Sequence, residues 1–384
     1  MDKKVKKDSK NNSNKARLVI VNLIMKRFHV FIITVLLVVF LTACAGFNSA
    51  ADQPEVEQAE EIESGIQDGH IYFYGEGAHG DKDYYTEELR IWGEFYDKGC
   101  RHLFEEVPYY EAEYLNEWMK ADSDTILYEL FRDWEGTAVY TSSTLEFYRY
   151  IKEHYPETIF HGTDVGHQWY STGKRYLNKL EDEGKTDTEE YAIAKENYAQ
   201  GKAFYSSAPA GVPVNDYREK CMAENVIREY EKIKGETVMG IYGTAHIWLG
   251  KKPYCNIDTM SQMLSDHYGD TFHTDLIVLP ENIRTDTLTV AGKEYEATFF
   301  GEIAIDSETK YAYGRLENAF EDLKDCPLTE NVLPYYNFPM KIEEQQIYIL
   351  EEIKKDGSVE RYFYRSDGYT WEGYPTTIEI KIEE

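Results

Sequence analysis

The chain has 384 residues and a formal net charge of −29 at pH 7. Nine of its 41 basic residues but only two of its 70 acidic ones lie in the first 43 positions, so the remainder carries a formal charge of −36. This excess of acid argues against a nucleic-acid partner, because nucleic-acid affinity depends on neutralising phosphates. The length suffices for one large α/β domain, or for one domain with a small appendage.

The N-terminal segment has the pattern of an export signal. Residues 1–17 are polar and basic, and Phe28 to Leu41 form an apolar run that is long enough for a signal peptide but short for a membrane span. The run ends in Leu-Thr-Ala-Cys, which resembles a bacterial lipobox and implies cleavage before Cys44 and a lipid on its sulfur. An uncleaved anchor is the alternative. Either interpretation places the protein at the extracytoplasmic face of the cell membrane, in the bacterial envelope.

Composition divides the rest of the chain into three parts. Residues 44–68 are polar and acidic and cannot bury enough apolar surface to fold, so we expect a flexible linker after the signal peptide of residues 1–43. We expect an α/β domain over 69–283 and a β-rich module over 284–384. The four further cysteines match no zinc-site spacing, and their pairing stays open; they are Cys100, Cys221, Cys255 and Cys326.

Predicted strands and helices alternate along the α/β domain, which is typical of a mainly parallel sheet flanked by helices. We expect strands at 70–74, 101–106, 158–162, 237–243 and 275–279. We expect helices at 82–98, 110–119, 123–134, 143–153, 217–234 and 259–267. Residues 170–234 are charged and rich in tyrosine, and their first part reads as a helical insertion. This insertion either covers a site as a lid or packs as ordinary helices.

The sequence pattern changes after Pro280 from helix-like spacing of apolar residues to strand-like alternation. Apolar residues alternate with polar ones at 288–300 and again at 378–382, and Asp356-Gly357 is a strong turn signal between two further strands. A short helix is expected at 315–323. These patterns predict a small β-rich module that supports or caps the larger domain.

Polar side chains follow four of the predicted strands at the point where each strand ends. They are Glu76 with His79, then Glu105 or Glu106, then Asp164, and finally His246. Because the carboxyl ends of parallel strands meet at one edge of a sheet, where α/β proteins bind their ligands, we expect these groups to converge.

Two histidines and several carboxylates can hold and activate a water molecule. Without a metal, His79 is the expected general base, oriented by Glu76 or Glu106, while His246 or Arg218 stabilises the oxyanion. With a metal, Glu76, His79, Glu106 and His246 offer ligands suited to Zn, Mn or Fe. No G-x-S-x-G motif is present, which disfavours a covalent serine hydrolase.

The motifs together resemble a known superfamily over about residues 70–280. Gly-Glu-x-x-His-Gly after the first strand, a glutamate ending the second, and Gly-x-x-His after a late strand are similar to the erythromycin esterases, the ChaN-like haem- or iron-binding lipoproteins and the Tiki/TraB proteins. Residues 218–225, Arg-Glu-Lys-Cys-Met-Ala-Glu-Asn, resemble a helix motif of the esterase-like branch. At Gly243 and Thr244 the chain lacks a second histidine that esterase-like members often have.

The resemblance implies a site and a function. It favours Glu106 over Glu105, and it implies catalytic roles for His79, Glu76, Glu106, His246, Glu224 and Arg218. The expected protein is an exported, membrane-anchored hydrolase of the erythromycin-esterase-like kind, with a small-molecule or peptide substrate and possible use of a divalent metal. The alternative is a non-enzymatic ChaN-like lipoprotein that binds haem, iron or another small ligand. A cell-surface structural protein with a decayed site is the third possibility.

Overall fold

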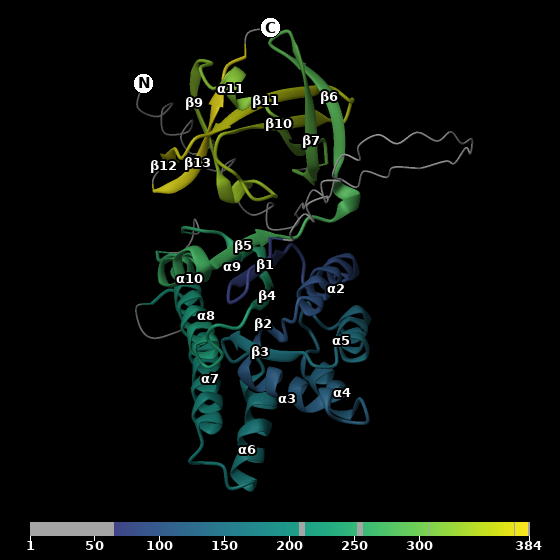
Figure 1. The fold of residues 1–384 in the computed structure, drawn as a ribbon, viewed down its shortest axis with the longest axis vertical. Helices are drawn as coiled ribbons and strands as arrows, with labels where there is room; N and C mark the ends of the chain where they lie inside the picture. The colour runs from purple at the N-terminus through teal and green to yellow at the C-terminus, as the bar shows by residue number, and fades with distance from the viewer. Residues whose placement is uncertain (1–64, 207–211, 252–255, 306, 372, 383–384) are drawn as a thin grey trace, which may run out of the picture.

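The computed structural model describes residues 65–206, 212–251, 256–305, 307–371 and 373–382 (Figure 1). The expected signal peptide, the lipidation site at Cys44, nearly all of the linker and Cys255 lie outside these residues. Within the described ranges, no helix combines the length and the apolar content needed to cross a bilayer. The three described cysteines, Cys100, Cys221 and Cys326, are free thiols.

A five-stranded parallel sheet lies at the centre of the N-terminal part, in the order β3-β2-β4-β1-β5. Its strands are β1 (Ile71–Glu76), β2 (His102–Pro108), β3 (Ile159–Asp164), β4 (Val238–Gly243) and β5 (Phe272–Leu276). The register sets Glu76 opposite Gly243 and Pro108 opposite Asp164, so the carboxyl ends of these strands form one edge. The expected mainly parallel α/β sheet is therefore confirmed.

The fifth strand lies three residues earlier than expected. Phe272 pairs with Ile71 and Leu276 with Gly75, which fixes β5 beside β1. The apolar run that suggested a strand at 275–279 continues past the strand end, where Ile277, Val278 and Leu279 are buried in the cores on either side. Burial of this run, rather than strand pairing, accounts for its composition.

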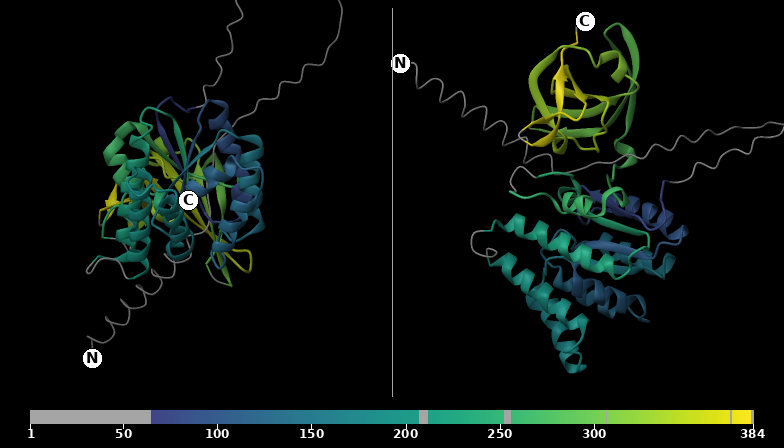
Figure 2. Two further views of the ribbon diagram at one scale, coloured as in Figure 1. Left: turned by 90° about the horizontal axis from the view of Figure 1, so that it is seen from below. Right: turned by 60° about the vertical axis from the view of Figure 1, so that its left-hand side comes forward.

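Helices cover both faces of the sheet, as the view from below in Figure 2 shows. Alternate strand residues feed the two cores, with Tyr72 and Leu103 in one and Phe73 and Phe104 in the other. One face carries α2 (Lys82–Asp97), α3 (Tyr109–Met119), α4 (Thr125–Asp133) and α5 (Ser142–His154), and the other carries α8 (Val214–Glu231), α9 (Thr244–Ile247) and α10 (Met260–Tyr268).

The helical insertion between β3 and α8 projects away from the sheet (Figures 1 and 2). It consists of a π-helical turn (Trp169–Gly173), α6 (Lys174–Asp182) and α7 (Glu189–Tyr205). Helix α7 packs tightly against the loop that follows β3. The two backbones lie so close together that a Cβ atom added at Gly201 would clash with the carbonyl oxygen of Gly166. The insertion is thereby held against the carboxyl edge of the sheet.

The C-terminal part is an antiparallel sheet in the order β12-β13-β11-β10-β8-β7-β6, with β9 paired to β13. The expected hairpin with Asp356-Gly357 at its turn is confirmed, because β10 pairs with β11 on either side of it. The elements are β6 (Arg284–Val290), β7 (Lys293–Ala304), β8 (Thr309–Leu316), α11 (Phe320–Leu323), β9 (Leu328–Pro334), β10 (Gln346–Lys354), β11 (Val359–Ser366), β12 (Thr370–Trp371) and β13 (Tyr374–Ile380).

The prediction of a short helix at 315–323 is wrong for the first part of this range. Arg315 and Leu316 belong to β8, where Leu316 pairs with Ala297 of β7 and Ile347 of β10. Only Phe320–Leu323 is helical. Over so short a stretch the side-chain spacing fits a helix and a strand equally well. Pairing with β7 on one side and β10 on the other makes these residues a strand. Short 3-10 turns complete the fold at Gly269–Thr271, Pro280–Asn282 and Tyr335–Asn337.

Gly201→Ala reverses the usual effect of this substitution in a helix. Alanine normally stabilises a helix interior by about 1 kcal/mol relative to glycine. Here the methyl group meets the Gly166 backbone, so we expect destabilisation of about 1–3 kcal/mol. Urea unfolding measures the difference, with the exposed Lys195→Ala on the same helix as a control expected within about 0.5 kcal/mol of wild type. A more stable Gly201→Ala variant would contradict the close packing.

Candidate active site

Glycines shape the loop that carries Glu76 and His79. A Cβ atom at Gly75 would lie 3.1 Å from the Thr244 Cα, so β1 and the start of α9 approach closely at the carboxyl edge. Gly80 has a φ of +72° and its backbone faces the Ala138 carbonyl, which only glycine accommodates without strain. The chain therefore turns sharply after β1 and directs His79 back over the strand ends.

Glu76 and His79 form a tight carboxylate–imidazole pair. Glu76 Oε1 lies 2.5 Å from His79 Nδ1, and the two side chains are 9% and 38% exposed. Burial alone would lower the pKa of His79, but Glu76 and then Glu106 raise it to about 10. His79 therefore carries a proton at neutral pH in the free site, and its Nε2 is 3.9 Å from Glu106 Oε1.

Glu106 is the hub of the cluster. Its Oε1 lies 2.5 Å from Arg218 Nη2 and 3.4 Å from His246 Nε2, while its Oε2 accepts a 2.5 Å hydrogen bond from the Gly243 backbone N–H. Burial opposes ionisation, but His246, Arg218 and His79 hold the pKa of Glu106 well below its usual range. Gly243 also leaves room for the His79 ring, because a Cβ atom added at Gly243 would lie only 3.1 Å from the Cε1 of His79.

Glu105 turns the other way. Since successive strand residues face opposite sides, Glu105 lies in the core on the α5 face, where the Tyr148 hydroxyl donates a 3.1 Å hydrogen bond to it. Burial raises the pKa of Glu105 to about 8. The structure thus brings Glu106, and not Glu105, to the other strand-end groups.

Arg218 links Glu106 to a second acid. Its guanidinium donates to both oxygens of Asp164, at 2.9 Å from Nε and 2.5 Å from Nη2. Asp164 is fully buried, and although burial opposes ionisation, Arg218 and His167 lower its pKa. His167 Nε2 lies 2.9 Å from Asp164, and its Nδ1 lies 2.5 Å from the hydroxyl of Tyr205 at the end of α7. The insertion thereby reaches the cluster through Tyr205.

Glu219 holds His246 in place. Its Oε1 lies 2.8 Å from His246 Nδ1, and its Oε2 accepts a 2.8 Å hydrogen bond from the Met260 backbone N–H at the start of α10. Glu219 is 1% exposed. Sequence reasoning assigned this helix position to Glu224 instead.

The structure does not bring Glu224 to the cluster. Its side chain is 58% exposed and lies 3.7 Å from Lys220, one turn earlier on the same helix. Met222 and Val226 face the core. Arg218 and Glu219 lie four and three residues before Met222 and share its face, whereas Glu224 lies two residues after it on the opposite side. Helical periodicity was thus the signal that distinguishes Glu219 from Glu224.

Two further groups near the site were also missed. Glu88 of α2 is 1% exposed, and burial together with the charge of Glu76 raises its pKa well above the ordinary range. His167 stood in the sequence directly after the third strand but gave no signal that separated it from a surface histidine. Only the fold shows that it faces Asp164.

The four residues considered as metal ligands are Glu76, His79, Glu106 and His246. They bind one another and their neighbours, and in the described part of the chain no group of three or more His, Cys, Asp or Glu side chains is arranged to hold a metal ion. The proposal below assigns the chemistry to the side chains themselves.

Comparison with known proteins finds similarity only among solved structures. No protein-family model matches the sequence, and no curated protein matches it. A mutant of the erythromycin esterase EreC in its open conformation is 11% identical, with a TM-score of 0.41, over 57% of this chain and 72% of that one. A Bacillus cereus protein is 14% identical, with a TM-score of 0.41, over 82% of this chain and 86% of that one.

A succinoglycan biosynthesis protein is also similar, at 14% identity and a TM-score of 0.41, over 60% of this chain and 71% of that one. An erythromycin esterase is thus among the proteins to which this chain is similar, which is the resemblance expected from the sequence motifs.

Proposed function

We propose that the protein is a hydrolase that cleaves an ester or a related acyl bond with a water molecule activated by His79. The observation that carries this proposal is the Glu76–His79 pair. Glu76 binds Nδ1 at 2.5 Å, which leaves Nε2 on the partly exposed side of the ring, facing the cluster. A carboxylate on one imidazole nitrogen and a reacting oxygen at the other is the arrangement by which histidine acts as a general base.

The reaction follows from this arrangement. His79 Nε2 accepts a proton from water while the water oxygen bonds to the acyl carbon. The bond from the acyl carbon to the leaving oxygen, or to the leaving nitrogen of a peptide, then breaks, and the proton passes from His79 to that leaving atom. His246 and Arg218, both held by Glu106, are the groups that would stabilise negative charge on the substrate carbonyl oxygen. The substrate is a small molecule or a peptide.

Screening the purified full chain against a panel of esters, lactones and peptides tests the proposal. We expect turnover by wild type and a loss of about 10²–10⁴-fold in His79→Ala, the usual contribution of a positioned base.

Glu219→Gln and Glu224→Gln form a matched pair on one helix. The first should lower kcat because it releases His246, and the second should leave it unchanged because Glu224 faces solvent. Absence of turnover with every substrate would contradict a hydrolase, and haem and iron titrations would then test the binding role.

The pH dependence separates a base from an acid. His79 works as a base only when neutral, and its pKa is about 10 in the free site. We therefore expect kcat/KM to rise with pH up to about 10, because this parameter reports the free enzyme. A decline through the same range would assign His79 as a proton donor instead.

The same group affects stability. Because the pKa of His79 in the folded protein lies above the unfolded value of about 6.5, the stabilisation from its charged ring is complete below pH 6.5 and is lost as the pH rises through 10.

We also propose that the protein is anchored at the extracytoplasmic face of the bacterial membrane by a lipid on Cys44. The apolar run and the lipobox-like residues before this cysteine support the proposal. In a bacterial host fed labelled palmitate, the full chain should incorporate label, and Cys44→Ser should not. Equal labelling of both forms, or of neither, would contradict lipidation at this residue.

A further inference from the structure

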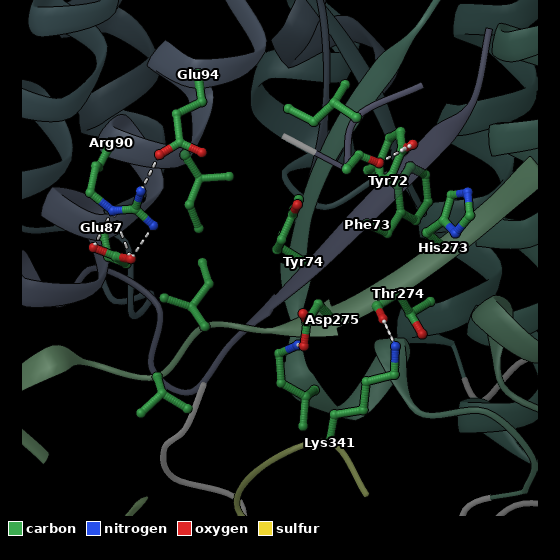
Figure 3. Close-up of a pocket in the computed structure, with 16 residues that line it drawn as sticks. Tyr72, Phe73, Tyr74, Glu87, Arg90, Glu94, His273, Thr274, Asp275 and Lys341 are labelled. Carbon is green, nitrogen blue, oxygen red and sulfur yellow. Dashed lines mark hydrogen bonds and ion pairs between the residues drawn. The ribbon is translucent and has the colours of Figure 1, made fainter. Parts of the chain in front are cut away.

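A second cavity lies apart from the Glu106 cluster (Figure 3). Its volume is about 190 Å³, and its walls come from α2, β1, β5, the segment after β5 and Lys341 of the C-terminal part. None of Glu76, His79, Glu106, Arg218 or His246 lines it. The cavity is therefore separate from the candidate active site, although Tyr74 on its wall stands only two residues before Glu76.

Asp275 presents a carboxylate to this cavity without a matching cation. Its Oδ1 accepts a 2.8 Å hydrogen bond from the Leu276 backbone N–H, and no ion pair to it is present in the described part of the chain. Burial raises the pKa of Asp275 to about 6, against the opposing effect of Lys341. At pH 7.5 the group is thus ionised, and a partly buried charge without a partner is costly.

The two cations at the cavity are already engaged. Arg90 donates to Glu87 at 2.9 Å and also binds Glu94. Lys341 Nζ donates to the Thr274 carbonyl at 3.0 Å, as the dashed line in Figure 3 marks. The lining holds three carboxylates and two cations, a formal charge of −1 that favours a cation over an anion; they are Glu87, Glu94 and Asp275 against Arg90 and Lys341.

The remaining walls suit a short organic chain. The Tyr74 hydroxyl makes no hydrogen bond within the described residues, and Tyr74 lies directly opposite Asp275 in the pairing of β1 with β5, so the two side chains share one face of the sheet. Aliphatic side chains line much of the rest; they are Ile66, Ile91, Leu276, Ile277 and Val278. An ammonium group offers three donors, which match a carboxylate and a phenolic oxygen, while an alkyl tail would bury against the aliphatic wall.

We propose that this cavity binds a small primary amine in its ammonium form. The ammonium group lies between the Asp275 carboxylate and the Tyr74 hydroxyl, and the alkyl chain packs against Ile91, Ile277 and Val278. The ligand supplies the cation that Asp275 lacks. The ring of Tyr74 adds a favourable aromatic surface for a cation. This proposal does not depend on the hydrolase reaction, because no residue of the Glu106 cluster takes part in it.

Calorimetric titration of the full chain in detergent micelles tests the proposal with n-butylammonium chloride as the probe. We expect saturable binding by wild type, weakened more than tenfold in Asp275→Asn and several-fold in Tyr74→Phe. Asp266→Asn removes the same charge from the exposed side of α10, away from the cavity, and should bind as wild type does. n-Butanol has a similar shape without the charge and should not bind, and sodium chloride at equal concentration controls for ionic strength.

Three results would overturn the proposal: no binding of n-butylammonium to wild type, equal binding to Asp275→Asn, or equal binding of n-butanol. Thermal unfolding without amine gives a second check on the premise. Since asparagine replaces a carboxylate without a cation, Asp275→Asn should be at least as stable as wild type at pH 7.5. A clear loss of stability would mean that the carboxylate is already satisfied. If Asp275→Asn fails to fold, unchanged binding to Tyr74→Phe would equally overturn the assignment.

Discussion

The buried carboxylate of Glu106 is the interaction on which the rest of the site depends. It joins four elements, since it lies on β2 and binds the Gly243 backbone at the end of β4, Arg218 of α8 and His246 of α9. A charge in this position is stable only while its partners are present, because removing one partner of a buried ion pair costs about 3–5 kcal/mol. Arg218 in turn needs Asp164, and His246 needs Glu219. The geometry of the cluster is thus maintained jointly.

This dependence explains why the glycines matter as much as the charged groups. Gly243 offers its backbone N–H to Glu106 and, having no side chain, leaves space for the His79 ring. Gly75 allows β1 and α9 to approach, which brings the loop of His79 over the strand ends. The site therefore arises from the edge of the parallel sheet, where close backbone approach and converging side chains occur together.

Much of this could be predicted from the sequence, since apolar runs ending in polar residues mark buried strands that lead to a ligand edge. The parallel sheet, both helix layers and the convergence of Glu76, His79 and His246 were expected on that ground. What local pattern leaves open is orientation. Which of two adjacent acids faces the site depends on strand register, and the choice between Glu219 and Glu224 depends on which face of α8 is buried. The position of β5 and the strand at Arg315 depend on pairing partners far away in the chain, which periodicity over a few residues does not specify.

The carboxylates that orient His79 also oppose its use as a base. Glu76 and Glu106 hold the ring where its Nε2 faces the cluster, and their charge raises its pKa to about 10, so the free site stores a proton. The carboxylates that position the ring therefore also keep it protonated, and so unavailable as a base near neutral pH, as long as both face it undisturbed. A bound substrate that draws Glu106 away from the ring would weaken this contact and lower the pKa of His79, whereas drawing away Arg218, whose charge lowers that pKa, would raise it. On the other side of Glu76, burial and the charge of Glu76 raise the pKa of Glu88 well above its usual range, which disfavours a further negative charge there. The reactivity of His79 would then depend on substrate binding, because the ring would lose its proton and become available as a base only when the site is occupied.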